Sequence, residues 1–153
     1  MNSILRRRRA LMGAKVELNY IIPSDSAGRG ESVATFTEGN LLHLSRLAKG
    51  GDNDIRGYFL RTISIKAGDT VQLKITRKSG TFSSGIVVKF YIGSLVMNSD
   101  TITWTTSTNV DMTKTASTAI NATYFRIVNS SNARTGNNDS HLVEIIINGE
   151  QVI

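Results

Sequence analysis

The sequence predicts an all-β fold, a β-sandwich or jelly roll preceded by a short basic N-terminal segment. The chain has 153 residues, of which 40% are hydrophobic and one is proline. This length fits one domain with a sizeable core, and the composition is typical of a globular protein. After Val16, short runs alternate apolar with polar residues, and polar turn residues separate them. We therefore divide the chain into an anchoring segment, residues 1–15, and a β-sandwich domain, residues 16–153.

The first predicted strands lie between residues 33 and 78. "VATFT" (33–37) is a short strand, and "LLHLSRLAKGG" (41–51) fits a strand or a single turn. "YFLRTISIK" (58–66) and "TVQLKITRK" (70–78) flank "AGD" and predict a hairpin, in which Gly68 supplies the positive φ of a tight turn. The apolar positions expected to point inward from the second strand are Val71, Leu73 and Ile75.

The remaining strands are predicted at 86–93, 101–106, 123–129 and 142–148, with a loop at 130–140. Asn148–Gly149 marks a final turn, because this dipeptide favours positive φ angles. Roughly eight or nine short strands separated by polar turns predict two packed sheets, with an open barrel as the alternative. The residues expected to face inward are Ile86, Val88, Phe90, Ile92, Val143, Ile145 and Ile147.

Positive charge is concentrated at the N-terminus. The formal net charge is +6, and residues 1–16 contribute +5 of it through Arg6, Arg7, Arg8, Arg9 and Lys15. The rest of the chain is nearly neutral, so we expect no nucleic-acid-reading domain. No apolar run approaches the roughly 18–20 residues that span a membrane, so we expect no membrane insertion.

The basic segment carries apolar residues on both sides of its arginines. Ile4, Leu5, Leu11 and Met12 fall on one side of a helical wheel, and Arg6–Arg9 cover most of the remainder. Docking into an acidic groove of a protein is the preferred interpretation, because arginines bind carboxylates bidentately while apolar anchors fill a groove. The alternatives are nucleic-acid binding, a membrane-surface helix and a solvated tail.

No catalytic or cofactor motif is present, so we expect a protein that is not an enzyme and needs no cofactor. The two histidines, His43 and His141, lie in no metal-ligand spacing, cysteine is absent, and no serine occupies a GxSxG elbow. Asp52, Asn53 and Asp54 could supply calcium ligands, but they lack the EF-hand pattern, and an ordinary turn is the preferred interpretation.

Aromatic residues offer a candidate glycan site. Trp104, with Tyr58, Tyr91 and Tyr124, could form a sugar-stacking platform, although packing within the sandwich is the preferred interpretation. If sugar binds, Trp104 is the expected anchor, and the hydroxyl-binding groups would be Asn137, Asn138 and Asp139. The nine threonines of residues 101–123 fit an exposed sheet face, or a surface where identical subunits stack.

Four stretches carry a resemblance to a known class of protein. "MNSILRRRRALMGAK" resembles the basic leader that precedes β-sandwich domains in structural proteins of bacteriophages and prophages. "IKAGDTVQLKI", "ATYFRIVNSS" and "EIIINGEQV" resemble strands of lectin-like or carbohydrate-binding sandwiches appended to such proteins. The resemblance implies a virion component, such as a head fibre, capsid-decoration or tail-tip protein. Its implied partners are a capsid or tail protein, further copies of itself in a trimer, and a bacterial-surface glycan as an alternative ligand.

Overall fold

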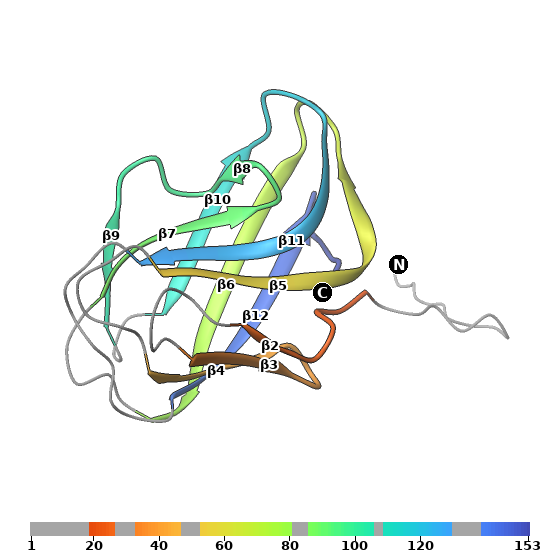
Figure 1. Cartoon of the computed structure of the whole chain (residues 1–153). Helices are drawn as coiled ribbons and strands as arrows, with labels where there is room; N and C mark the ends of the chain where they lie inside the picture. The colour runs from red at the N-terminus through yellow and green to blue at the C-terminus, as the bar shows by residue number, and fades with distance from the viewer. Residues whose placement is uncertain (1–18, 27–32, 47–52, 81–85, 106–108, 130–138) are drawn as a thin grey trace, which may run out of the picture.

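The protein is an all-β sandwich, as predicted. The computed structural model describes residues 19–26, 33–46, 53–80, 86–105, 109–129 and 139–153. In these ranges the regular structure consists of strands in two antiparallel sheets, and no helix there could cross a membrane (Figure 1). The anchoring segment, residues 1–15, lies outside the described residues.

The larger sheet has seven strands, and its path begins at β10 and ends at β2. The order is β10 (Val110–Thr115), β6 (Thr70–Ser79), β12 (Asp139–Ile147), β4 (Leu41–Arg46), β3 (Val33–Thr37) and β2 (Ser24–Ser26). The short β13 (Glu150–Gln151) pairs with β12 through the Asn148–Gly149 turn. Both turn residues have positive φ angles, 52° and 84°, which confirms the predicted turn.

The smaller sheet has five strands and lies in front in Figure 1. The order is β5 (Asn53–Ile65), β11 (Ile120–Asn129), β7 (Ile86–Ile92) and β8 (Leu95–Val96), and β9 (Ile102–Trp104) pairs with β7. Residues 20–22 extend the β5 edge, because Ile22 N donates to Tyr58 O at 2.8 Å and Leu60 N donates to Tyr20 O at 2.9 Å. The Asn19 side chain also bonds both backbone polar groups of Arg61, at 2.7 and 2.9 Å.

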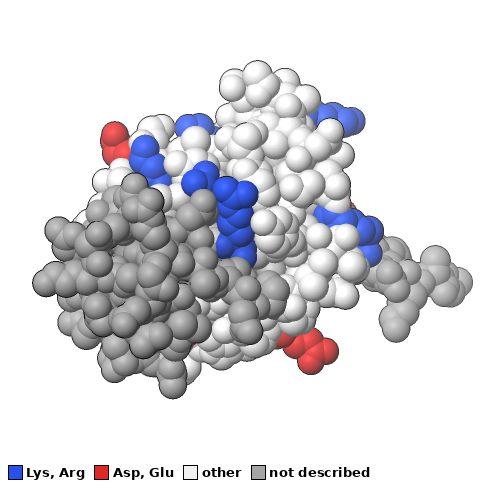
Figure 2. Space-filling model, viewed as in Figure 1, with Lys and Arg blue, Asp and Glu red and all other residues white. Residues whose placement is uncertain are grey.

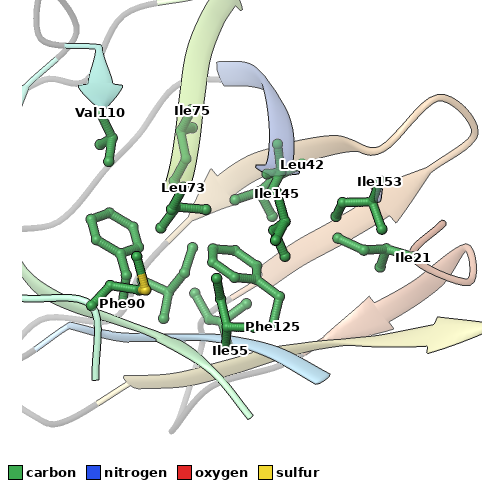
Figure 3. Close-up of a cluster of buried hydrophobic side chains, with 14 of the residues drawn as sticks. Ile21, Leu42, Ile55, Leu73, Ile75, Phe90, Val110, Phe125, Ile145 and Ile153 are labelled. Carbon is green, nitrogen blue, oxygen red and sulfur yellow. The ribbon is translucent and has the colours of Figure 1, made fainter. Parts of the chain in front are cut away.

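Alternating side chains from the two sheets meet in one core. The residues predicted to face inward from β6, β7 and β12 are buried, except Ile147, which is only partly buried. Leu73 and Ile145 point toward Phe90, Phe125 and Ile55 of the other sheet (Figure 3). Phe125 stacks with Phe90 at 6.3 Å between ring centroids and meets Phe36 edge-on. Each large buried side chain stabilises the fold by about 1.5–3 kcal/mol.

The predicted hairpin at residues 58–78 is wrong, although both of its strands exist. β5 belongs to the five-stranded sheet and β6 to the seven-stranded sheet, so the turn between them crosses from one sheet to the other. Gly68 has the expected positive φ, 92°. The positive φ predicted for Gly68 is therefore confirmed. A Gly–Asp turn suits a crossing between two sheets as well as a hairpin.

Long-range hydrogen bonds tie this crossing into a corner. The Asp69 carboxylate accepts from Lys66 N at 2.7 Å and from Asn148 Nδ2 at 2.9 Å, and these bonds lower the pKa of Asp69. Thr70 N donates to Asn148 Oδ1, and Ala116 N donates to Asp69 O. Three turns far apart in sequence thus share one corner, which we call the Asp69 corner.

Two further expectations are resolved. β4 is a strand, which was one of the two interpretations of residues 41–51. The threonine-rich stretch contains β9, β10 and the start of β11, and Thr113 and Thr115 are exposed on β10. An exposed sheet face is therefore the structure of this part of the stretch.

Candidate functional site

Exposed apolar side chains gather at one edge of the five-stranded sheet. Among the described residues the exposed large hydrophobics are Tyr20, Ile22, Tyr58 and Leu60, which are 40–49% exposed. Ile21 pairs with Phe59, and both are buried, so alternation turns their four neighbours to the outside. We call these four residues the edge patch. A contiguous exposed apolar patch is typical of an interaction site, whereas single exposed apolar residues are ordinary.

An array of tyrosines and arginines continues from the edge patch across the same face. Tyr58 meets Tyr124 edge-on, with 6.4 Å between ring centroids. The Arg56 guanidinium lies over the Tyr124 ring, and that of Arg126 lies over Tyr91, each with Cζ 4.9 Å from the ring centroid. We call these five residues the arginine–tyrosine array. Figure 2 shows Lys and Arg side chains over the middle of this view and acidic side chains near its outline.

The array is a locally basic face on a body of nearly neutral sequence. Arg126 stands directly opposite Arg56 in the register. Lys89 stands opposite Val128, which follows Arg126 by two residues on β11. This face is not visible in the net charge of the chain, because a net charge near zero does not show where charged side chains gather. The sequence offers the three tyrosines as candidates but neither arginine.

Trp104 does not belong to this face. Its side chain is fully buried, and its ring lies 5.6 Å from Phe90 and 4.7 Å from His141 between centroids. A ring with no exposed surface offers no face to a sugar, so the glycan-anchor interpretation of Trp104 gives way to the packing interpretation. Of its expected companions, Asp139 is also buried, and Asn137 and Asn138 lie outside the described residues.

Asp139 and His141 are two buried polar residues that stand two positions apart on β12. Both point inward from β12, and among the described residues no donor reaches either carboxylate oxygen of Asp139. Burial raises the pKa of Asp139, and the charge of Arg77 opposes this shift. Burial also lowers the pKa of His141 to about 4, and the charges of Arg77 and His43 act in the same direction. Burial thus disfavours the charged form of both groups.

The remaining expected site residues are not tested by the structure. The docking residues Ile4, Leu5, Arg6–Arg9, Leu11 and Met12 lie outside the described residues, as does Asp52. Asn53 and Asp54 begin β5. In the part of the chain that the structure describes, no group of three or more His, Cys, Asp or Glu side chains is placed to hold a metal ion.

No protein-family model matches the chain, and no curated protein matches its sequence significantly. The chain is therefore assigned by its fold, which is a two-sheet β-sandwich with an aromatic outer face.

Proposed function

We propose that this protein is a non-enzymatic structural component of a phage particle, which docks on a capsid or tail protein through its basic N-terminal segment and the edge patch. The observation that carries the docking role is the edge patch, where the exposed large hydrophobics of the described chain lie together. Tyrosine is among the residues that contribute most to protein interfaces, and a contiguous exposed apolar patch is typical of an interaction site. The virion location follows the resemblance of the leader and of the strand motifs.

The position of the edge patch supports a shared docking role with the basic segment. The Asn19 side chain is fixed to the backbone of Arg61, one residue beyond Leu60 of the patch. Because Asn19 follows the basic segment by only four residues in the chain, a single partner surface can engage both. Two linked contacts raise the effective concentration of each for the other, so neither has to bind tightly alone.

A trimer is part of this proposal. The resemblance to phage appendages implies three-fold assembly. The exposed threonines of β10 are available for the contacts between subunits. Light scattering of the full chain tests it: a mass three times the 16.7 kDa of one chain is expected, and a monomer at all concentrations contradicts it.

Binding of a cell-surface glycan is the second candidate function. The observation in its favour is Tyr58, 49% exposed beside Tyr124 on a sheet face. Against it, guanidinium groups already lie over the rings of Tyr124 and Tyr91, and sugars stack on open ring faces. A glycan array with a Tyr58→Thr control decides: binding that the variant loses favours this function over docking.

Incorporation into particles tests the proposed function. Virions of the phage or prophage that encodes the chain would be purified with each variant, and the protein quantified by mass spectrometry. Deletion of residues 1–15 is expected to abolish incorporation, and Tyr58→Thr with Leu60→Thr to reduce it about tenfold or more. Threonine keeps the strand preference of β5. Lys78→Thr with Glu150→Thr, at exposed positions of the opposite sheet outside β10, introduces the same two threonines as a matched control and should incorporate normally. Normal incorporation of the truncated protein contradicts the proposal.

A further inference from the structure

The turn between β12 and β13 presents an asparagine–glycine pair to solvent. Asn148 and Gly149 are both exposed, and a Cβ atom placed on Gly149 would meet nothing within 4 Å. An asparagine followed by glycine is chemically labile, because a residue without a Cβ leaves its backbone nitrogen unshielded. The turn therefore combines a reactive pair of residues with open access for water.

Deamidation is the reaction open to this pair. The backbone nitrogen of Gly149 loses its proton and bonds to Cγ of Asn148, and the Nδ2 group takes up a proton and leaves as ammonia. Water then opens the cyclic succinimide that has formed. Cleavage of the bond between Cγ and nitrogen gives aspartate, whereas cleavage at the backbone carbonyl gives isoaspartate, in which the chain runs through Cβ. Water is the only co-reactant, so the step needs no enzyme.

The Asp69 corner engages both ends of the reacting amide. Asn148 Nδ2 donates to Asp69 Oδ1 at 2.9 Å, and Asn148 Oδ1 accepts from Thr70 N at 3.0 Å. The bond from Asn148 and that from Lys66 N lower the pKa of Asp69, so its carboxylate is charged at neutral pH and the bond from Nδ2 is charge-assisted. The Asn148 side chain has to give up both of its bonds before Cγ can turn toward the Gly149 nitrogen. The corner is therefore expected to slow the ring closure.

We propose that Asn148 is a site of spontaneous deamidation that the Asp69 corner holds in check, and that its conversion opens this corner. Aspartate at this position has no donor for Asp69. It also places a carboxylate where the amide nitrogen now lies 2.9 Å from Asp69 Oδ1, and two carboxylates this close repel each other. Isoaspartate in addition lengthens the backbone of the turn that pairs Ile147 with Glu150. This inference is independent of the proposed docking role.

Peptide mapping by mass spectrometry tests the restraint on the full chain, incubated at mildly alkaline pH. The reference is a peptide of residues 145–151, IIINGEQ, which has the reactive pair but lacks the corner. Ammonia loss at Asn148 is expected to be about tenfold or more slower in the folded chain than in the peptide, because two hydrogen bonds oppose it. Asp69→Ala should raise the rate in the folded chain about threefold or more. Asp111→Ala removes another exposed carboxylate of the same sheet, which accepts from Gln72, and should leave the rate unchanged.

Asn148→Asp reproduces the aspartate product and tests the opening of the corner. Its melting temperature is expected to fall by about 4 °C or more. The exchanged pair Asp69→Asn/Asn148→Asp restores one donor and one carboxylate, so it should recover at least half of this loss. Asn121→Asp is the matched control, because this exposed asparagine only accepts a bond from Ser64 Oγ through an oxygen that aspartate keeps. Its melting temperature should stay within about 2 °C of wild type.

Three results overturn the inference. Ammonia loss as fast in the folded chain as in the peptide shows that the corner restrains nothing. A reacting peptide with no modification at Asn148 in either the wild type or Asp69→Ala removes the site. A melting temperature of Asn148→Asp equal to that of wild type shows that the corner does not depend on the amide. If circular dichroism shows that Asp69→Ala is unfolded, Asp69→Asn takes its place, because it keeps an acceptor for Lys66 N.

Discussion

Charged side chains are arranged in opposite ways on the two outer faces of the sandwich. On the seven-stranded sheet, Lys74 stands between Asp111 on β10 and Glu144 on β12, and Gln72 donates to Asp111 at 2.7 Å. On the five-stranded sheet, Arg126 stands opposite Arg56. The first face alternates its charges, as expected of a surface selected for stability in water, whereas the second repeats them beside exposed apolar residues. The exposed apolar residues on the second face support the docking role that we propose for it.

The largest expected effect lies beneath the aromatic face. Trp104→Ala should lower the free energy of unfolding by about 3–5 kcal/mol, because it leaves a cavity beside Phe90 and His141. Urea unfolding measures it. Tyr58→Ala on the outer face should cost under about 1 kcal/mol, since that ring is half exposed. Equal losses in the two variants would place Tyr58 in the fold rather than at an interface.

A second effect distinguishes the inner surfaces of the two sheets, since only β12 among the described strands brings a buried Asp and His into the core. The pKa of His141 is about 4 in the fold and 6.5 ordinarily. Between these pH values the unfolded chain binds the proton and the folded chain does not. Stability should therefore fall by about 3 kcal/mol as pH drops from 6.5 to 4. His141→Leu should lose this pH dependence, and His43→Leu should keep it.

The pKa of Asp139 shifts in the opposite direction from that of His141, so Asp139 provides a control for the same titration. Its pKa is raised by burial, so the folded state binds a proton more tightly than the unfolded state. The free-energy cost of burying the charged Asp139 carboxylate is therefore present at neutral pH. It is relieved as the pH falls toward 3.8, the ordinary pKa of an aspartate. Asp139→Asn should stabilise the protein at pH 7 and lose this advantage in acid. Destabilisation by Asp139→Asn at neutral pH would show that the carboxylate is charged and paired.

The smallest effect compares the outer faces directly by reversing one charge on each. Lys74→Glu places three acidic groups in a row and should cost about 1 kcal/mol. Arg126→Glu should cost less than this, because the new carboxylate stands opposite Arg56 and their attraction offsets part of the lost contact with Tyr91. Urea unfolding at low and high salt measures both. If the two reversals cost the same, the arginine row is as structural as the Lys74 row.

Sequence reasoning identified the strands more reliably than their partners. Alternation along residues 70–78 and 86–92 fixes which side chains face inward, because the strand period is local. The pairing of β6 with β10 and β12 depends on contacts far along the chain, and this is why a hairpin with β5 was wrongly expected. Asp139 was assigned to a polar loop because nothing in its neighbours shows that β12 begins there.

The candidate site was hidden for the same reason. Its residues come from positions near 20, 56–60, 91 and 124–126, which only the register of four segments brings together. Arg56 and Arg126 look like ordinary polar residues between buried ones. A sequence signal does exist in hindsight: arginine and tyrosine occupy alternate positions in β5 and again in β11.

The Asp69 corner has a consequence for how the chain reaches its native state. Asn148 bonds Thr70 and Asp69, which precede it in the chain by 78 and 79 positions, and it lies five residues before Ile153. During synthesis the corner cannot close until Asn148 has emerged, so the turn between β5 and β6 waits for the hairpin between β12 and β13. Such distant pairings make folding slow relative to helical domains of similar size. Loss of even the final ten residues should therefore leave a chain that collapses without completing the sandwich.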